Sequence, residues 1–375
     1  MILAYGIKAS ARHGPAGRIL QRLHLDGMLL AGILATLLVG EVVLYSAAGR
    51  DQSVMYGQGL RVLVAIGVMV AIAQVNPSVI RRIAPWLFGI GIIMLTMVLV
   101  AGEVGKGAQR WLNIGVRFQP SELMKLAVPA ALAWLLHERP LPPSLSLVLA
   151  MLAIIMAPVA MIGLQPDLGT AILISLTGAT VIFLAGINAR YILSTLAIVM
   201  ASMPMLWYSM LDYQKQRVLT LMNPDSDPLG AGYHIIQSKI AIGSGGIFGK
   251  GWLNGSQGQL EFLPERSTDF IFAVAGEEFG LLGTMAILLL YLAVVARGFY
   301  IAAAAQDTFS RLLAGSISLT FFFYVFVNSA MVTGLVPVVG IPLPLISAGG
   351  TSMVTLLAGF GILMSIQTHR KFLPR

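Results

Sequence analysis

Long apolar stretches recur along the whole chain, and they constrain its fold more than any other feature. Each run of 18 or more apolar residues is long enough to cross roughly 30 Å of hydrocarbon as an α-helix. Charged residues make up 11% of the chain and hydrophobic residues 57%, whereas about a quarter of the residues in a soluble domain are charged. The 375 residues therefore predict an all-α, polytopic transmembrane helical bundle that forms a single domain over residues 1–375.

About ten spans are predicted from these runs, at residues 27–47, 58–76, 83–101, 120–137, 144–164, 167–186, 190–211, 269–296, 310–333 and 350–367. Basic residues in the short connections predict that both chain ends lie in the cytoplasm. Residues 1–26 precede a full-length span without a signal-peptide cleavage site, so we interpret them as a retained cytoplasmic tail. Residues 212–268, between spans seven and eight, are predicted to form a large extracytoplasmic loop with a short amphipathic helix over residues 233–242.

The composition argues against several functions. A net charge of +8 fits the cytoplasmic loops of a membrane protein better than a nucleic-acid-binding surface. The chain has no cysteine, and its histidines are scattered without metal-ligand spacing. The segment Gly243–Gly251 resembles a phosphate-binding loop, but Ser244 stands where the motif needs glycine and Gly251 where it needs serine or threonine. We therefore predict no nucleotide site.

Charged residues beside the spans gather on the predicted extracytoplasmic side. The segment Gln119–Lys125 is typical of a helix start, with Pro120 in the first turn. Glu122 and Lys125 are three residues apart and therefore share a face of that helix. An ordinary ion pair explains this pattern; alternatively, Lys125 or Arg110 contacts an anionic group of a substrate near the helix N-terminus.

Asp167 lies at the start of the next extracytoplasmic helix, in the segment Gln165–Gly169. A helix cap explains an aspartate at this position. A carboxylate here is also suited to a divalent cation that bridges a diphosphate. The sequence leaves both interpretations open.

Asp269 is the strongest candidate for a catalytic residue. It follows the polar segment Pro264–Thr268 and precedes an apolar run. Asp269 begins the predicted span, and Ala273, Gly276 and Gly280 fall on its face of the helix, which is typical of the mouth of a groove or of a close helix contact. A carboxylate in that position is suited to act as a general base.

Two further features of the spans call for partners inside the bundle. Glu277, Glu278 and Glu41 are acids within spans, and we expect them to pair with polar groups of the protein. The segment Pro337–Thr351 is apolar but too rich in proline and glycine for a regular helix. Irregular backbone at membrane depth is tolerated where it is buried in protein or lines a cavity, so we expect this segment to line the same cavity.

Together these motifs resemble the shape, elongation, division and sporulation (SEDS) family. The resemblance rests on Gly107–Trp111, Gln119–Lys125, Gln165–Thr170, Phe262–Phe270 and Pro342–Ser347. It extends over all ten predicted spans. The segments Pro264–Phe270 and Ser365–Lys371 resemble the elongation members more than the division members. Ala348 departs from the pattern, which has tyrosine before the two glycines.

The resemblance implies a peptidoglycan glycosyltransferase of the bacterial cytoplasmic (inner) membrane that polymerises lipid II with a class B penicillin-binding protein as its partner. It implies that Asp269 is the essential aspartate. We expect substrate-binding residues at Arg110, Glu122, Lys125, Asp167, Arg217, Lys239, Glu265 and Arg266. A divalent cation, Mg or Mn, is a possible cofactor whose ligands the sequence does not identify.

Two other functions remain as alternatives. A flippase for the lipid-linked cell-wall precursor needs polar residues that lead across the bundle, whereas the candidates here lie mostly on one side of it. A non-catalytic scaffold for the penicillin-binding protein would make Asp269 dispensable.

Overall fold

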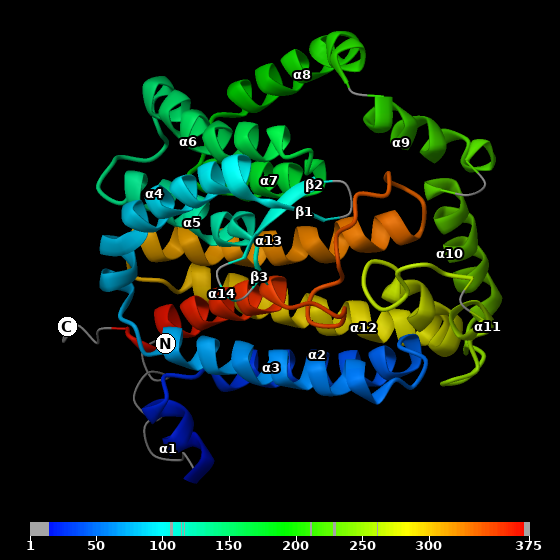
Figure 1. Cartoon of the computed structure of the whole chain (residues 1–375). Coiled ribbons are helices and arrows are strands. Elements are labelled where there is room, and N and C mark those ends of the chain that lie inside the picture. The colour runs from blue at the N-terminus through cyan, green and yellow to red at the C-terminus, as the bar shows by residue number, and fades with distance from the viewer. Residues whose placement is uncertain are drawn as a thin grey trace, which may run out of the picture.

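The computed structural model describes residues 15–105, 108–113, 115, 117–210, 212–227, 230–260 and 262–370. Most of them are helical (Figure 1). The helices are α1 Pro15–Arg22, α2 Gly27–Ala47, α3 Gln52–Ala73, α4 Pro77–Ala101, α5 Pro120–Leu136, α6 Leu145–Leu164, α7 Leu168–Leu184, α8 Ala189–Ser209, α9 Asp212–Met222, α10 Ala231–Gly245, α11 Ser256–Gln259, α12 Ile271–Ala303, α13 Thr308–Val332 and α14 Thr351–Thr368, with a 3-10 turn, η1, at Pro224–Ser226.

The predicted all-α bundle is confirmed. Helices α2 to α8 and α12 to α14 coincide with the predicted spans, with ends that differ by a few residues. In the described part of the chain, α2, α3, α4, α6, α12, α13 and α14 are long and apolar enough to cross a membrane, and α7 is apolar but shorter. The count of ten spans and the orientation of the chain ends stay predictions, and residues 1–14 of the predicted tail lie outside the described residues.

A small antiparallel sheet, which the sequence did not predict, lies between α4 and α5. Its strands are β1 Glu103–Gly105, β2 Ala108–Asn113 and β3 Arg117–Phe118, in the order β1-β2-β3. Strand β2 contacts both α4 and α5. The sheet therefore holds the side chains of β2 against the N-terminal end of α5.

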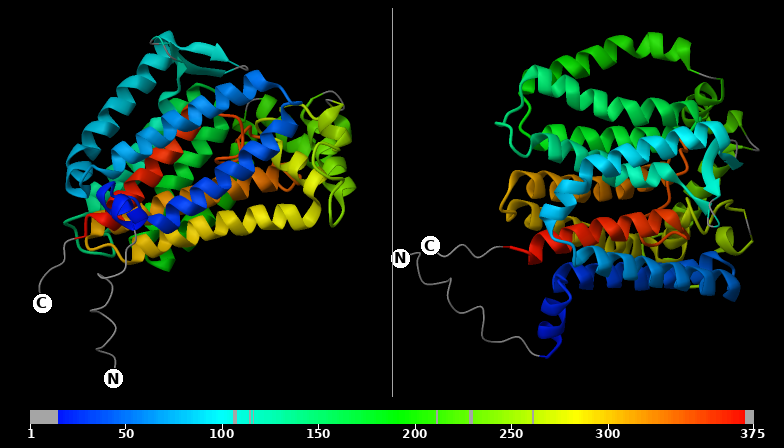
Figure 2. Two further views of the ribbon diagram at one scale, coloured as in Figure 1. Left: turned by 90° about the horizontal axis from the view of Figure 1, so that it is seen from below. Right: turned by 60° about the vertical axis from the view of Figure 1, so that its left-hand side comes forward.

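Helix α13 lies at the centre of the bundle and packs against α5, α7, α12 and α14. Figure 2 shows the same neighbours from two further directions. Hydroxyl groups join α13 to α7: Thr180 and Ser316 share a hydrogen bond of 2.8 Å, and Thr320 donates one of 3.1 Å to Thr177. Such polar contacts stabilise helix pairs where no water competes for them.

Helix α12 is interrupted at Gly280, whose φ is 64°. The glycine-rich segment after α10 hydrogen-bonds to the break. The carbonyl groups of residues 277 and 278 accept bonds of 3.0 Å from the amides of Lys250 and Gly251, and the amides of residues 281 and 282 donate to the carbonyl groups of residues 246 and 247. The break therefore leaves these backbone groups paired, as the interior of a membrane requires.

The helix predicted over residues 233–242 is confirmed as part of α10, which packs on α12. The loop that the sequence predicted over residues 212–268 also contains α9, η1 and α11, so much of it is helical.

The glycines of this loop have a structural role. A Cβ atom at Gly249, where φ is 80°, would lie 2.1 Å from the carbonyl oxygen of Glu278.

Replacement of Gly249 by alanine is expected to destabilise the protein, because the new methyl group overlaps the α12 backbone. Overpacking of this kind costs about 1–3 kcal/mol, and the positive φ adds strain. Thermal unfolding in detergent measures the effect. Gly243→Ala is the matched control, because a Cβ atom there meets nothing within 4 Å. Equal unfolding midpoints for the two variants would contradict this packing.

Candidate functional site

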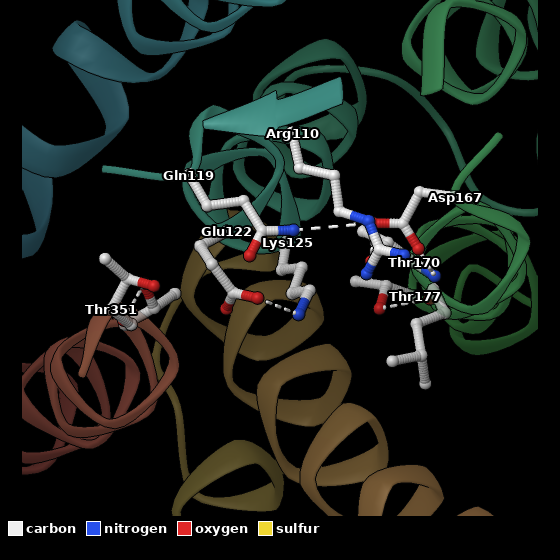
Figure 3. Close-up of polar contacts among 10 residues, drawn as sticks. Arg110, Gln119, Glu122, Lys125, Asp167, Thr170, Thr177 and Thr351 are labelled. Atoms are coloured by element: carbon white, nitrogen blue, oxygen red, sulfur yellow. Dashed lines mark hydrogen bonds and ion pairs between the residues drawn. The ribbon is translucent and has the colours of Figure 1, made fainter. Parts of the chain in front are cut away.

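A cavity of about 170 Å³ lies where strand β2, helices α5 and α7 and the segment before α14 meet. Its lining is polar on the side of β2 and α5. The residues are Arg110, Trp111, Gln119, Glu122, Lys125, Thr170, Leu173, Gly340, Ile341, Pro342, Gly349, Gly350, Thr351 and Ser352. The structure thus brings three of the predicted substrate-binding residues into one cavity, and Figure 3 shows their arrangement.

Glu122 and Lys125 form a buried ion pair on α5. Lys125 Nζ lies 2.6 Å from Glu122 Oε1, and each side chain is 7% exposed. The ammonium group also lies 4.9 Å from the centre of the Tyr324 ring of α13, at a distance suited to a cation–π contact. The predicted shared face is therefore confirmed, with both side chains at the cavity wall.

Arg110 reaches from β2 toward Asp167, which caps α7 (Figure 3). Arg110 Nε lies 3.4 Å from Asp167 Oδ2, and among the described residues this buried Nε has no hydrogen-bond acceptor. Asp167 accepts bonds from the amide and the hydroxyl of Thr170 at 3.3 and 3.0 Å. Asp167 therefore caps the helix and faces a cation at once, and that cation lines the cavity.

The segment between α13 and α14 lines the cavity, as the sequence predicted, and it contacts the turn that carries Asp269. Asn328 of α13 donates to the carbonyl groups of Asp269, at 2.8 Å, and Ile341, at 2.7 Å. Ser347 Oγ donates to the carbonyl group of Thr268 at 2.5 Å. A Cβ atom at Gly340, a lining residue, would lie 3.4 Å from Asp269 Oδ2. The Asp269 carboxylate therefore adjoins the cavity wall.

The predicted helical face below Asp269 is wrong. Helix α12 begins at Ile271, so Asp269 lies in the preceding turn. Gly276 faces Ile242 of α10, and Gly280 contacts the backbone of the glycine-rich segment. The small residues therefore serve close packing against α10 and its following loop. Contacts with residues 328 and 340 position the aspartate, and helical periodicity does not reveal them.

His234 of α10 lies next to this turn, where its ring stacks on that of Phe270 with the ring centres 5.7 Å apart. Burial lowers the pKa of His234 below its ordinary value, against the opposing charges of Glu265 and Asp227. Burial thus favours the neutral form of the His234 ring, which stacks on Phe270, the residue after Asp269.

Glu277 and Glu278 pair with groups of the protein, as predicted. Lys250 Nζ lies 2.7 Å from Glu277 Oε1, and the amide of Gly258 donates to Glu277 Oε2 at 3.3 Å. Ser46 donates to Glu278. The two acids therefore fasten residues 250–258 and helix α2 to α12.

Five of the predicted substrate-binding residues are not among those that line the cavity. One is Asp167, which pairs with the lining residue Arg110. Arg217 is on α9. Lys239 lies on α10 beside the turn at Gly334. Glu265 accepts a bond of 2.9 Å from Thr268, and Arg266 donates to the carbonyl group of Gly258. Their role in substrate binding stays a prediction.

Sequence reasoning missed three residues of the site. Gln119 donates to Asp167 at 3.4 Å, Tyr324 faces Lys125, and Asn328 joins the turn of Asp269 to the segment before α14. Asn328 was detectable in principle, because a fully buried amide in an apolar span needs partners.

A divalent cation fits the described residues poorly. They contain no group of three or more His, Asp or Glu side chains placed to hold a metal ion. The carboxylates at the cavity, Glu122 and Asp167, each face a cationic side chain. We therefore derive no catalytic step through a metal ion.

Comparison with known proteins identifies the family. The model of the FtsW/RodA/SpoVE family of cell cycle proteins matches residues 27–372. The chain belongs to this family. The peptidoglycan glycosyltransferase MrdB of Escherichia coli strain K12 is 51% identical over 356 residues, which cover 94% of this chain and 96% of MrdB. The probable peptidoglycan glycosyltransferase FtsW of Geobacter sulfurreducens strain DL-1/KN400 is 36% identical and covers 93% and 96%.

Solved structures share the fold of this FtsW/RodA/SpoVE chain. A chain from a study of polymerization and crosslinking by a peptidoglycan synthase complex has a TM-score of 0.81 and 30% identity, with coverage of 91% of this chain and 97% of that one. The rod shape determining protein RodA of Thermus thermophilus has a TM-score of 0.70 and 28% identity, with coverage of 92% and 98%. The predicted family is therefore confirmed over nearly the whole chain.

Two substitutions of Asp167 distinguish its role as a helix cap from the effect of its negative charge. Asp167→Asn keeps an oxygen for the amide of Thr170, whereas Asp167→Ala removes it, and loss of a cap costs about 1 kcal/mol. We expect the alanine variant to unfold at the lower temperature in detergent. Both variants remove the negative charge facing Arg110, so any difference between them reports the cap. Identical midpoints would show that Asp167 does not stabilise α7 in this way.

Proposed function

We propose that this protein is a peptidoglycan glycosyltransferase that polymerises lipid II into glycan strands during cell elongation. The observation that carries the proposal is the cavity in which Arg110 and Lys125 stand beside the segment that adjoins Asp269. Family membership and the MrdB relative support it. We also propose that a class B penicillin-binding protein is its partner in the inner membrane, in line with the peptidoglycan synthase complex among the structural neighbours.

In the proposed reaction, the hydroxyl group of an acceptor sugar attacks the anomeric carbon of a donor glycan. Asp269 takes the hydroxyl proton as the new C–O bond forms. The bond between the anomeric carbon and the diphosphate breaks, and polyprenyl diphosphate leaves with the electron pair. A single displacement inverts the anomeric carbon, so an α-linked donor gives a β-linked strand. The energy comes from the lipid diphosphate bond, so the reaction needs no nucleotide.

Arg110 and Lys125 are proposed to stabilise the charge that develops on the leaving diphosphate. Both are cations at the cavity wall, and a fixed cation in a water-poor site stabilises developing charge more than one in bulk water. The Arg110 side chain lines the cavity and is 28% exposed, which supports this role. A divalent cation, Mg or Mn, would supply further positive charge to the leaving group and stays a proposal that the described residues do not support.

Removal of the Asp269 carboxylate is expected to abolish most polymerisation. Loss of a general base lowers rates by about 10²- to 10⁴-fold. Purified protein with its penicillin-binding partner and labelled lipid II gives the measurement, with Asp269→Asn and Asp269→Ala compared with Asp225→Asn, an exposed aspartate of η1. Polymer formation at the parental rate in the Asp269 variants would refute the catalytic assignment. Transport of labelled lipid across vesicles without polymer would favour a flippase.

The roles of Lys125 in stability and in catalysis can be separated. Lys125→Met leaves Glu122 buried and unpaired, which costs about 3–5 kcal/mol for such a pair. We expect the double variant Glu122→Gln/Lys125→Met to regain stability but to stay about 100-fold less active, because a transition-state donor is lost. Thermal unfolding and polymerisation of both variants test this, and recovery of activity in the double variant would show that Lys125 is purely structural. Lys215→Met, on α9 and outside the cavity, is the control.

A further inference from the structure

A second cavity lies at the opposite end of the bundle from α10 and α11. Three turns meet there: the start of α4, the connection between α12 and α13, and the end of α14. Figures 1 and 2 show α1 at the same end. The cavity has a volume of about 290 Å³, whereas one water molecule needs roughly 10–15 Å³ of such space. It can therefore hold a group of several heavy atoms, and the proposed sugar transfer makes no use of it.

The charge of this cavity is positive. Arg81 comes from the first turns of α4, and His369 and Arg370 follow α14. Asp307 is the lining acid, and its two oxygens accept bonds of 2.9 and 2.7 Å from the amide and the hydroxyl of Ser310. Two guanidinium groups therefore face one carboxylate that is already engaged. The two arginines and the aspartate together carry one net positive charge, which matches a monoanion.

Arg370 also lines this cavity. Its Nη2 donates to Gln367, but its Nε is buried without a hydrogen-bond partner among the described residues. A buried donor that stays unpaired costs free energy, so such a group calls for a ligand or a water molecule. Guanidinium groups bind phosphate oxygens in a paired geometry better than other side chains do.

Helix α4 exposes apolar side chains on one side of Arg81. Val79, Ile83 and Trp86 of the same helix are 43%, 45% and 73% exposed, and an exposed tryptophan near the end of a span is typical of the membrane interface. Apolar chains attached to an anion at Arg81 can therefore lie along the exposed apolar side chains of α4. The starts of α4 and α13 also direct their helix dipoles toward this cavity.

We propose that this cavity binds a phosphodiester anion, with the guanidinium groups of Arg81 and Arg370 as its ligands. Two sources supply this chemistry: the headgroup of an anionic phospholipid, or a soluble phosphate ester. By the predicted orientation, the cavity faces the cytoplasm, where the inner leaflet presents such headgroups. A bound phosphodiester joins three turns that are distant in the sequence, so its binding is expected to raise the unfolding temperature.

Native mass spectrometry of the full-length protein in detergent tests the proposal. Phosphatidylglycerol and phosphatidylcholine are added at equal concentrations, and glycerophosphoglycerol, the soluble phosphodiester, is added in a separate thermal-unfolding series. We expect preferential retention of phosphatidylglycerol and about 100-fold weaker retention by Arg81→Gln/Arg370→Gln, because the charged hydrogen bonds of both guanidinium groups are lost. Circular dichroism and size-exclusion profiles confirm that the variants are folded.

Arg82→Gln is the matched control, because it removes the same charge from the next, exposed residue, which does not line the cavity. Retention of phosphatidylglycerol by this control but not by the double variant supports a lipid headgroup. Stabilisation by glycerophosphoglycerol that the double variant loses, without any preference between the two lipids, supports a soluble ester. Equal losses in the control and the double variant, or no binding of either phosphodiester, would overturn the proposal. If the double variant does not fold, Arg81→Lys replaces it, and unchanged retention in that variant counts against paired guanidinium binding.

Discussion

Polar groups inside a membrane must find their partners within the protein, because hydrocarbon offers none. The break in α12 depends on this constraint. Gly280 interrupts the helix, and the glycine-rich segment supplies partners to the exposed backbone groups. Glu277, which would be costly to bury alone, fastens the same segment through Lys250 and the amide of Gly258. Arg266 then joins Gly258 to the turn that carries Asp269. The catalytic candidate thus depends on a chain of contacts that begins at a helix break.

The same constraint applies to the charged side chains at the cavity, which must also find partners within the protein. Lys125 lies in a helix that packs against α13, and its charge is offset by Glu122 and by the face of Tyr324. Arg110 stands opposite Asp167 in the same way. Each cation is thereby tolerated beside an apolar core, and both residues line the cavity. A substrate diphosphate would meet charges that are already oriented, which reduces the reorganisation required in the transition state.

The sequence allowed much of this to be predicted, for identifiable reasons. Apolar runs located the helices because a span must bury its whole length in lipid. The spacing of Glu122 and Lys125 predicted their pairing because residues three apart are neighbours on a helix. The position of Asp167 before an apolar run predicted a cap as one of two interpretations, and the structure confirms the cap. The sheet between α4 and α5 was missed, since its short strands are stabilised by contacts with those helices and carry little signal of their own.

The sequence by itself determined that the chain is a membrane bundle, which residues carry charge at the ends of its spans, and to which family it belongs. Those properties depend on hydrophobicity, local spacing and motifs, which are local features of the amino-acid sequence. The tertiary structure alone decided that Asp269 lies before α12 and beside Gly340, and that Arg266 contacts Gly258 rather than the cavity. Such placements depend on contacts between segments that are tens of residues apart, where a broken helix and an irregular segment pair their backbones.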